Sequence, residues 1–192
     1  MKGKILFTAA ILMVFFLGTA QALEFSADTI MSSSGRSVKG KMFMKDKKLR
    51  MESEGMPGYS IMRSDKNVIW MVMPSSQSYM EMKSDPANRP KTEEKVQGEI
   101  NRKKIGEEKI NGHPTEKFEV SYKHNGKTGK IYQWMATDIK FPVKTAATDG
   151  SFSQEYKNIK MGGQPDSLFE VPSGYRKMTM PAMPMPQAPT GR

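Results

Sequence analysis

The chain has no cysteine among its 192 residues and only two histidines. The absence of cysteine excludes disulfides, thiol nucleophiles, thiolate metal ligands and attachment of a lipid to an N-terminal cysteine. His113 and His124 each lie beside a predicted turn, where a zinc cluster or a histidine-based triad is not expected. No nucleophile elbow, phosphate-binding loop or dinucleotide fingerprint occurs, and adjacent acids such as Glu107 and Glu108 are typical of a solvated face. These features predict a protein that is not an enzyme and that requires no cofactor or metal.

Long apolar runs are also scarce, and the run from Ile5 to Leu17 is too short to span a bilayer as a helix. Lysines precede this run, and the sequence AQA at residues 20–22 supplies the small residues that a signal peptidase accepts. The pattern predicts a cleaved secretory signal peptide over residues 1–22. We therefore expect a periplasmic mature protein without a lipid anchor.

Lys and Arg outnumber Asp and Glu by 30 to 20, which gives a formal net charge of +10. This charge favours an anionic membrane surface or an acidic protein as a partner, and secretion makes nucleic acid the least expected one. The positive residues are scattered and mixed with acids, a distribution that also keeps a β-rich protein soluble and its sheet edges unpaired. The charge alone is consistent with both explanations.

Turn signals divide the chain into short segments. The clearest are the Asn-Gly pairs at 111–112 and 125–126 and the Asp-Gly pair at 149–150. Between the turns, apolar and polar side chains alternate, as in KFEVSY at residues 117–122, which predicts strands with one dry and one wet face. Around ten strands joined in this way predict an antiparallel meander that curls into an open or closed barrel.

Residues 68–73 (VIWMVM) break the alternation because both faces of this strand are apolar. A strand with a solvated face would alternate, so this one must be covered on both sides. Two other segments lack strand character. The charged residues 85–97 contain prolines and predict a loop with a short helix from Lys91 to Gln97, lying across the sheet opening. The residues 178–192 are rich in Pro and Met and predict a disordered tail.

Methionine is the compositional outlier, with 18 residues in the chain. Its flexible, unbranched side chain can form an adaptable apolar wall for an acyl chain, or it can simply fill the core in place of leucine. Thioethers are also soft ligands for Cu(I). Two sets of methionines would suit a copper site: Met42, Met44, Met71 and Met73 on strands, or Met180, Met183 and Met185 in the tail. The strand methionines lie among Trp, Val and Ile rather than histidines, which ranks wall or core above copper.

Several stretches resemble a known superfamily. VKGKMFMKDKKLRMESEG and YSIMRSDKNVIWMVMP look like the early strands of the LolA/LolB superfamily of bacterial lipoprotein carriers and receptors, with Gly40, Arg50 and Trp70 at the matching positions. INGHPTEKFEV and DSLFEVPSGYRKM are similar to segments of the DUF4412 group within it. The resemblance implies, over residues 23–177, an incomplete antiparallel β-barrel of about eleven strands. This barrel would surround a hydrophobic cavity that is capped by helices.

The resemblance also implies that the cavity binds an acyl chain, a lipid or a lipid-modified protein without catalysis. Burial of hydrocarbon alone supplies about 0.8 kcal/mol per CH₂. Arg50 is expected to act as a gate or head-group contact, because guanidinium donors pair with carbonyl or phosphate oxygens; a solvated Arg50 between inward-facing neighbours is the competing interpretation. The cavity lining is expected to comprise Met42, Met44, Leu49, Met51, Trp70, Val72, Phe118, Val120 and Tyr122.

Other functions remain open. The main alternative is a structural or interaction module of the cell envelope whose core is filled by its own side chains. Copper binding through methionine ranks third, and hydrolysis ranks last.

Overall fold

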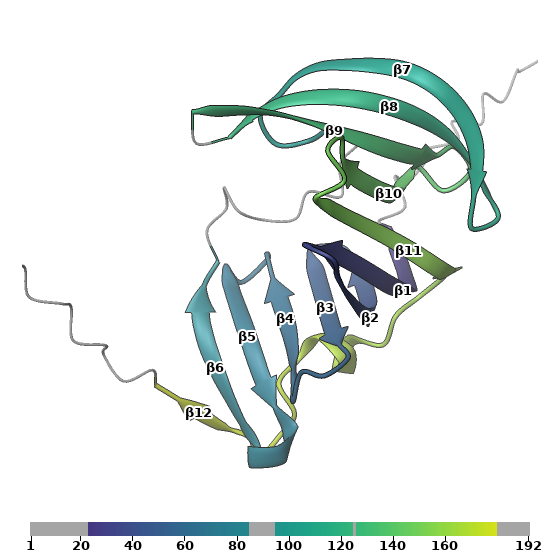
Figure 1. The fold of residues 1–192 in the computed structure, drawn as a ribbon. Coiled ribbons are helices and arrows are strands. Elements are labelled where there is room, and N and C mark those ends of the chain that lie inside the picture. The colour runs from purple at the N-terminus through teal and green to yellow at the C-terminus, as the bar shows by residue number, and fades with distance from the viewer. Residues whose placement is uncertain (1–22, 85–94, 125, 180–192) are drawn as a thin grey trace, which may run out of the picture.

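The computed structural model describes residues 23–84, 95–124 and 126–179, which form one 12-stranded sheet (Figure 1). The strand order in the sheet is β12-β6-β5-β4-β3-β2-β1-β11-β10-β9-β8-β7. In chain order the strands are β1 (Glu24–Ser33), β2 (Arg36–Lys45), β3 (Lys48–Ser53), β4 (Tyr59–Arg63), β5 (Val68–Met73), β6 (Ser78–Lys83), β7 (Glu99–Ile110), β8 (His113–His124), β9 (Lys127–Ala136), β10 (Phe141–Ala147), β11 (Phe152–Met161) and β12 (Arg176–Met178). The same described ranges also contain two short 3₁₀-helices, η1 (Pro74–Ser76) and η3 (Asp166–Phe169).

Most neighbouring strands are joined by tight turns of the kind that the sequence predicts. At the turn between β7 and β8, Asn111 and Gly112 both have positive φ, of 50° and 92°, which suits an Asn-Gly pair and allows a two-residue hairpin. The main exception to sequential pairing is β1, which pairs with β2 on one side and with β11 on the other. The first strand of the domain therefore lies in the middle of the sheet (Figure 1).

The mainly β, open, antiparallel architecture is confirmed in outline, with corrections. The sheet has 12 strands rather than about eleven, and it does not close, because β7 and β12 are both edges. The additional strand, β12, pairs in parallel with β6, so regular structure extends to Met178, the first residue of the expected tail.

The described part of the chain contains no α-helix, so the helical cap that the superfamily resemblance implies is not seen there. Of the helix expected from Lys91 to Gln97, residues 95–97 form bends and turns instead, and residues 91–94 lie outside the described residues. The expected signal peptide and most of the expected tail also lie outside them.

The larger hydrophobic cluster lies where β1, β10 and β11 meet. The rings of Phe25 on β1 and Phe141 on β10 contact edge-on at 4.7 Å, and those of Phe141 and Tyr156 on β11 at 5.1 Å. Because β11 lies between β1 and β10, the first contact indicates that the sheet curves toward the face that carries Phe25. The other buried members of this cluster are Ala27, Met42, Met44, Leu49, Trp134, Ala136 and Val143.

Gly40 on β2 has a steric reason to be glycine. A Cβ added there would lie 2.1 Å from the backbone oxygen of Glu52 on β3 and 3.0 Å from the Thr29 hydroxyl on β1. Real Cβ atoms do not approach a carbonyl oxygen so closely, so a side chain at this position would separate β2 from β3.

The C-terminal strap, defined here as residues 162–175, covers the opposite face of β3 to β5. Its Phe169 is fully buried and packs with Ile61 on β4 and with Trp70 and Val72 on β5. Strand β5 therefore has a buried side beneath the strap, which explains why apolar residues occupy that face of VIWMVM. The sequence predicts that both faces of residues 68–73 are covered, and the strap covers one of them.

Replacing Phe169 with alanine should show how much the strap contributes to stability. Because the side chain is 0% exposed, its removal leaves a cavity, and we expect the free energy of unfolding to fall by about 3–5 kcal/mol. Urea denaturation followed by tryptophan fluorescence measures this change. The control Met56→Ala, at a position that is 63% exposed, should shift the free energy by less than about 0.5 kcal/mol. Equal stabilities for the two variants would contradict the strap's place in the core.

Candidate functional site

Strands β1 to β6 and β12 align their same-face side chains into two rows rich in methionine. Residues directly opposite one another on paired strands point to the same face, so the register determines which side chains share it. The first row contains Ala27, Met42, Met51, Ser60, Met71, Met80 and Met178. The second row contains Phe25, Met44, Leu49, Met62, Ile69 and Met82. We call this side of the sheet the methionine face; the strap lies on the other side.

The methionine face divides into a packed part and an outlying part. Met42, Met44 and Leu49 belong to the larger hydrophobic cluster, and Met51 and Met62 pack against it. Beyond them, on β5, β6 and β12, neither hydrophobic cluster of the described residues includes the side chains of Ile69, Met71, Met73, Met80, Met82 and Met178. All of these except Met178, which is 47% exposed, are half-buried. We call this group the methionine strip.

Four of the expected lining residues, Met42, Met44, Leu49 and Met51, are on the methionine face of β2 and β3. Phe118, Val120 and Tyr122 alternate along β8 and share one face of that strand, and Val120 is fully buried. The neighbouring Lys117 pairs with Trp134, which belongs to the larger hydrophobic cluster, so Phe118 points to the side of β8 away from Trp134.

The other expected residues lie on the strap face. The register places Arg50 opposite Ile61 and Ile61 opposite Trp70, and Val72 follows Trp70 on the same side of β5. The Trp70 indole Nε1 donates a hydrogen bond to Glu81 at 2.9 Å. Trp70 and Val72 therefore pack beneath the strap, away from the methionine face.

Arg50 contacts the strap. Its guanidinium lies 3.6 Å above the ring of Tyr59, forms an ion pair of 2.7 Å with Glu52 and donates to the Leu168 backbone oxygen at 3.4 Å. Leu49 and Met51 point to the other face, as the alternation of a strand requires. The position of Arg50 suits retention of the strap, and it does not reach the methionine face.

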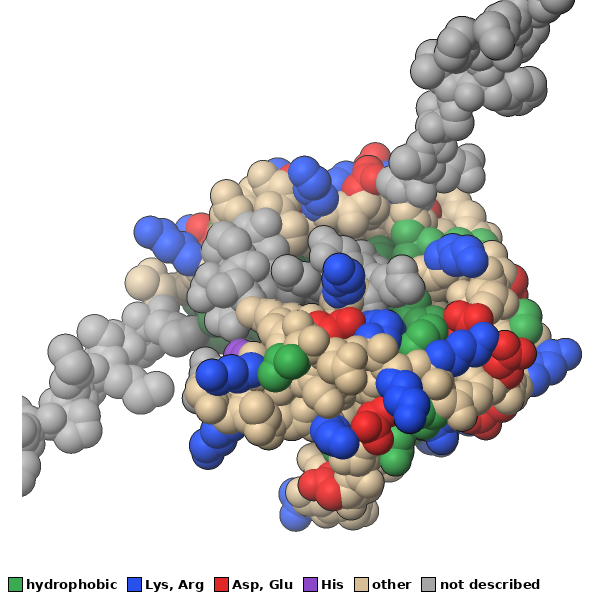
Figure 2. Space-filling model, turned by 90° about the horizontal axis from the view of Figure 1, so that it is seen from above, with side chains coloured by type: hydrophobic (Ala, Val, Ile, Leu, Met, Phe, Trp, Pro, Cys, Tyr) green, Lys and Arg blue, Asp and Glu red, His purple; other side chains and the backbone are tan. Residues whose placement is uncertain are grey.

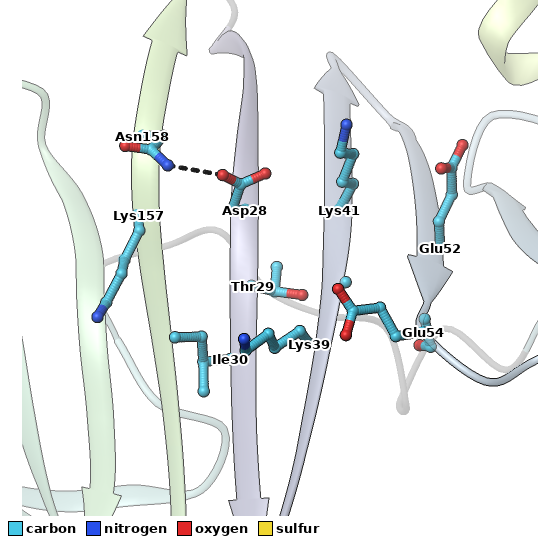
Figure 3. A pocket seen from close by; sticks show the side chains of 11 residues that line it. Asp28, Thr29, Ile30, Lys39, Lys41, Glu52, Glu54, Lys157 and Asn158 are labelled. Carbon is cyan, nitrogen blue, oxygen red and sulfur yellow. Dashed lines mark hydrogen bonds between the residues drawn. The ribbon is translucent and has the colours of Figure 1, made fainter.

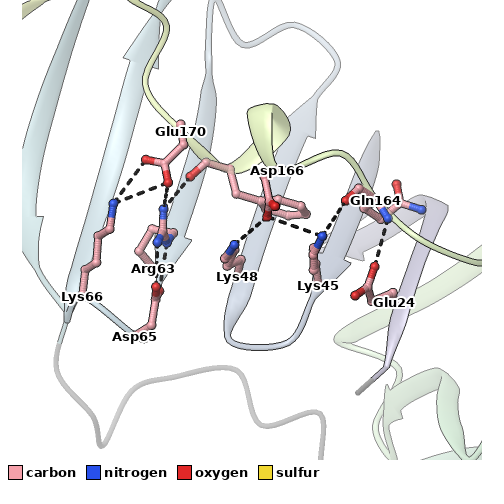
Figure 4. Close-up of polar contacts among 10 residues, drawn as sticks. Glu24, Lys45, Lys48, Arg63, Asp65, Lys66, Gln164, Asp166 and Glu170 are labelled. Carbon is pink, nitrogen blue, oxygen red and sulfur yellow. Dashed lines mark hydrogen bonds and ion pairs between the residues drawn. The ribbon is translucent and has the colours of Figure 1, made fainter. Parts of the chain in front are cut away.

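A buried arginine that the sequence analysis did not single out also holds the strap (Figure 4). Arg63 at the end of β4 is 4% exposed and donates to both carboxylate oxygens of Asp65, to Glu170 and to the Phe169 backbone oxygen. These hydrogen bonds raise the pKa of Arg63 and lower the pKa of Asp65 to about 2. The only hint in the sequence is the Arg-Ser-Asp spacing at the start of a predicted turn.

Three lysines extend this polar attachment along the strap (Figure 4). Lys48 and Lys45 form ion pairs with Asp166 at 2.7 and 3.4 Å, and Lys66 pairs with Glu170 at 3.3 Å. Asp166 and Glu170 are substantially exposed, so each of these pairs contributes little by itself. Together they fix the register of the strap over strands β2 to β4.

Two grooves near the middle of the sheet are charged. One, of about 480 Å³, runs over β11, β1, β2 and β3, where Asp28, Lys41 and Glu52 are cross-strand neighbours of alternating sign (Figure 3). Asn158 donates to Asp28 at 2.7 Å. The other groove, of about 570 Å³, shares Asp28 and Lys41. The acidic and basic side chains that line the first groove largely neutralise one another.

The described residues contain no group of three or more His, Cys, Asp or Glu side chains placed to hold a metal ion. At the start of β8, the Nδ1 atom of His113 lies 2.8 Å from the Oδ2 atom of Asp138. Within the described ranges, no helix has the length and apolarity that crossing a membrane requires.

The model of the family DUF4412 (domain of unknown function) matches residues 26–140. The chain belongs to the DUF4412 family. This confirms the family resemblance seen in the sequence. No curated protein matches this DUF4412 chain in sequence.

Among solved structures, MucB is similar in fold to this DUF4412 protein, with a TM-score of 0.56 and 10% identity over 80% of this chain and 58% of MucB. The complex of MucA and MucB from Pseudomonas aeruginosa gives a TM-score of 0.54 and 12% identity over 77% of this chain and 56% of that one. A LolA superfamily protein from Nitrosomonas europaea matches with a TM-score of 0.34 and 11% identity over 79% of this chain and 91% of that one. The chain thus spans a little over half of the MucB chain.

The Arg63–Asp65 contact predicts a dependence of stability on pH. The pKa of Asp65 falls from an ordinary 3.8 to about 2 because of its hydrogen bonds with Arg63, so the folded state favours the carboxylate. The resulting stabilisation is present above pH 3.8 and is lost as the pH falls toward about 2. Wild type should therefore be more stable than Asp65→Asn at neutral pH, and this difference should shrink between these two pH values. Urea denaturation at a series of pH values measures it, and a difference that does not vary with pH would contradict the assignment.

Proposed function

We propose that this DUF4412 protein binds an acyl chain, of a free lipid or of a lipid-modified protein, along its methionine face in the cell envelope, without catalysing a reaction. The observation that carries the proposal is the methionine strip. It places several large apolar side chains on one face of the sheet, outside both hydrophobic clusters of the described residues. A group of partly exposed apolar side chains of this kind suits an interaction site.

Methionine suits an acyl chain better than a branched residue would. Its side chain has several rotatable bonds and a polarisable sulfur, so a wall of methionines can adapt to a chain that has no fixed shape. The opposite side of β5 is occupied by Phe169 of the strap, which leaves only the methionine face of this strand for a ligand. Hydrocarbon burial of about 0.8 kcal/mol per CH₂ provides sufficient driving force without any covalent step.

The similarity in fold to MucB supports an envelope role for this chain by analogy. Lys and Arg side chains alternate with Asp and Glu on the face seen in Figure 2, with small hydrophobic patches between them. This mixed pattern favours a lipid or lipid-modified partner over attraction to an anionic membrane surface by charge alone.

A protein-interaction module is the second candidate. The larger cluster is filled by its own side chains, including the Phe25, Phe141 and Tyr156 rings, so the curved part of the sheet already has a packed core. MucB is found in complex with MucA, which makes a polypeptide partner reasonable for a domain of similar fold. Under this alternative the methionine strip would contact a protein segment rather than a lipid.

A charge placed on the methionine strip should separate these functions from a purely structural role. Met80→Lys puts an ammonium group next to Met71 on the methionine face, and we expect the affinity for a fluorescent long-chain fatty acid to fall at least about tenfold. The matched control Met56→Lys makes the same chemical change at an exposed position and should bind like wild type. Fluorescence titration of the three proteins measures the effect. Failure of wild type to bind any fatty acid would reject the lipid proposal and favour the interaction module.

A further inference from the structure

Met80 is the centre of a cluster of thioethers on the methionine strip. Its direct partners across the sheet are Met71 on β5 and Met178 on β12. Met82 lies two residues along β6 and therefore points to the same face, and Met73 lies diagonally across β5. Other methionines thus lie one step from Met80 in each direction along the sheet.

The spacing allows several sulfur atoms to meet. Cross-strand neighbours have Cβ atoms about 4.5–5.5 Å apart, and diagonal neighbours lie about 7–8 Å apart. The Sδ atom lies two bonds beyond Cβ on a freely rotating side chain, so three sulfurs from this cluster can reach a common point above Met80. All but Met178 are half-buried, which keeps such a point partly shielded from water.

Glu81 and Lys177 point to the strap face, where Glu81 accepts hydrogen bonds from Trp70 and from Lys177 at 2.6 Å. Arg176 shares the methionine face, where it lies opposite Ser78 and two residues from Met178. The direct cross-strand neighbours of Met80 are thioethers, a soft ligand set that selects Cu(I) over hard or borderline cations.

We propose that Met71, Met73, Met80, Met82 and Met178 form a site for a soft monovalent cation, Cu(I) or Ag(I), held by three thioethers at a time. The set Met42, Met44, Met71 and Met73, which the sequence suggests, cannot form one site. Strands β3 and β4 lie between β2 and β5, so the first two methionines are about 14 Å, or three strand spacings, from the other two. Thioethers carry no proton, so cation binding should not change between pH 5 and pH 8, unlike binding by imidazole or thiolate. The site uses side chains of the methionine strip that are also proposed to contact an acyl chain, but cation binding does not depend on acyl binding.

Competition for Cu(I) tests the site. Under anaerobic conditions with a chromogenic Cu(I) chelator, wild type should withhold one Cu(I) per chain. The site variant replaces three cluster residues with leucine, as Met71→Leu, Met80→Leu and Met178→Leu. The control variant removes as many thioethers at exposed positions outside the cluster, as Met31→Leu, Met56→Leu and Met161→Leu. Methionine-to-leucine changes conserve volume, and thermal melting verifies that each variant is folded.

The expected result is an affinity at least about tenfold lower in the site variant, equivalent to about 1.4 kcal/mol, and an unchanged affinity in the control. Cu(I) binding by the site variant equal to that of wild type, or no binding by wild type, would overturn the proposal. If the site variant does not fold, NMR of wild type labelled with ¹³C at the methionine ε-methyl groups tests the site when Ag(I) is added. The cluster signals should shift while that of Met56 does not, and any other pattern rejects the site.

The same variant keeps the cation site distinct from the proposed function. Leucine preserves the apolar surface, so fatty-acid affinity should change less than threefold in the site variant while Cu(I) affinity falls. A failure of fatty-acid binding in wild type would leave the cation result unaffected.

Discussion

The packing of the sheet depends on covering both faces of β4 and β5. On one face, Phe169 of the strap packs over Ile61, Trp70 and Val72 and buries them. The strap contains only the short 3₁₀-helix η3, so hydrophobic contact alone could not hold its phenylalanine there, since its backbone polar groups also need partners. Arg63 provides this anchor by binding the Phe169 carbonyl and two acids together. The C-terminal segment is consequently part of the core.

Covering one face determines what the other can do. With the strap in place, a ligand can approach β5 only on the methionine face, where the side chains of β5 and β6 that extend beyond the core are nearly all methionine. An adaptable apolar surface and a soft ligand set are two properties of the same thioether groups. Replacement by leucine removes the thioether ligands and keeps the surface apolar, which makes the two roles separable by experiment.

Much of the fold could be predicted from the sequence, and much of the site could not. Alternation and Asn-Gly turns identify short antiparallel strands, because local chemistry determines both. The faces of Trp70 and Met71 could not be assigned, since VIWMVM is apolar at every position and only the register with β4 and β6 decides. The strap was missed because its partner Arg63 is distant in sequence by more than 100 residues, as the contact with Glu170 shows. Pairing between distant segments leaves no periodic signal.

The most direct test of the account is where an acyl chain lies on the protein. A fatty acid that carries a nitroxide on its chain can be titrated into protein labelled with ¹³C at the methionine ε-methyl groups. The account predicts that the signals of Met71 and Met80 broaden first and that the signal of the exposed Met56 remains sharp. Equal broadening of all three signals, or broadening of the Met56 signal alone, would contradict binding on the methionine face.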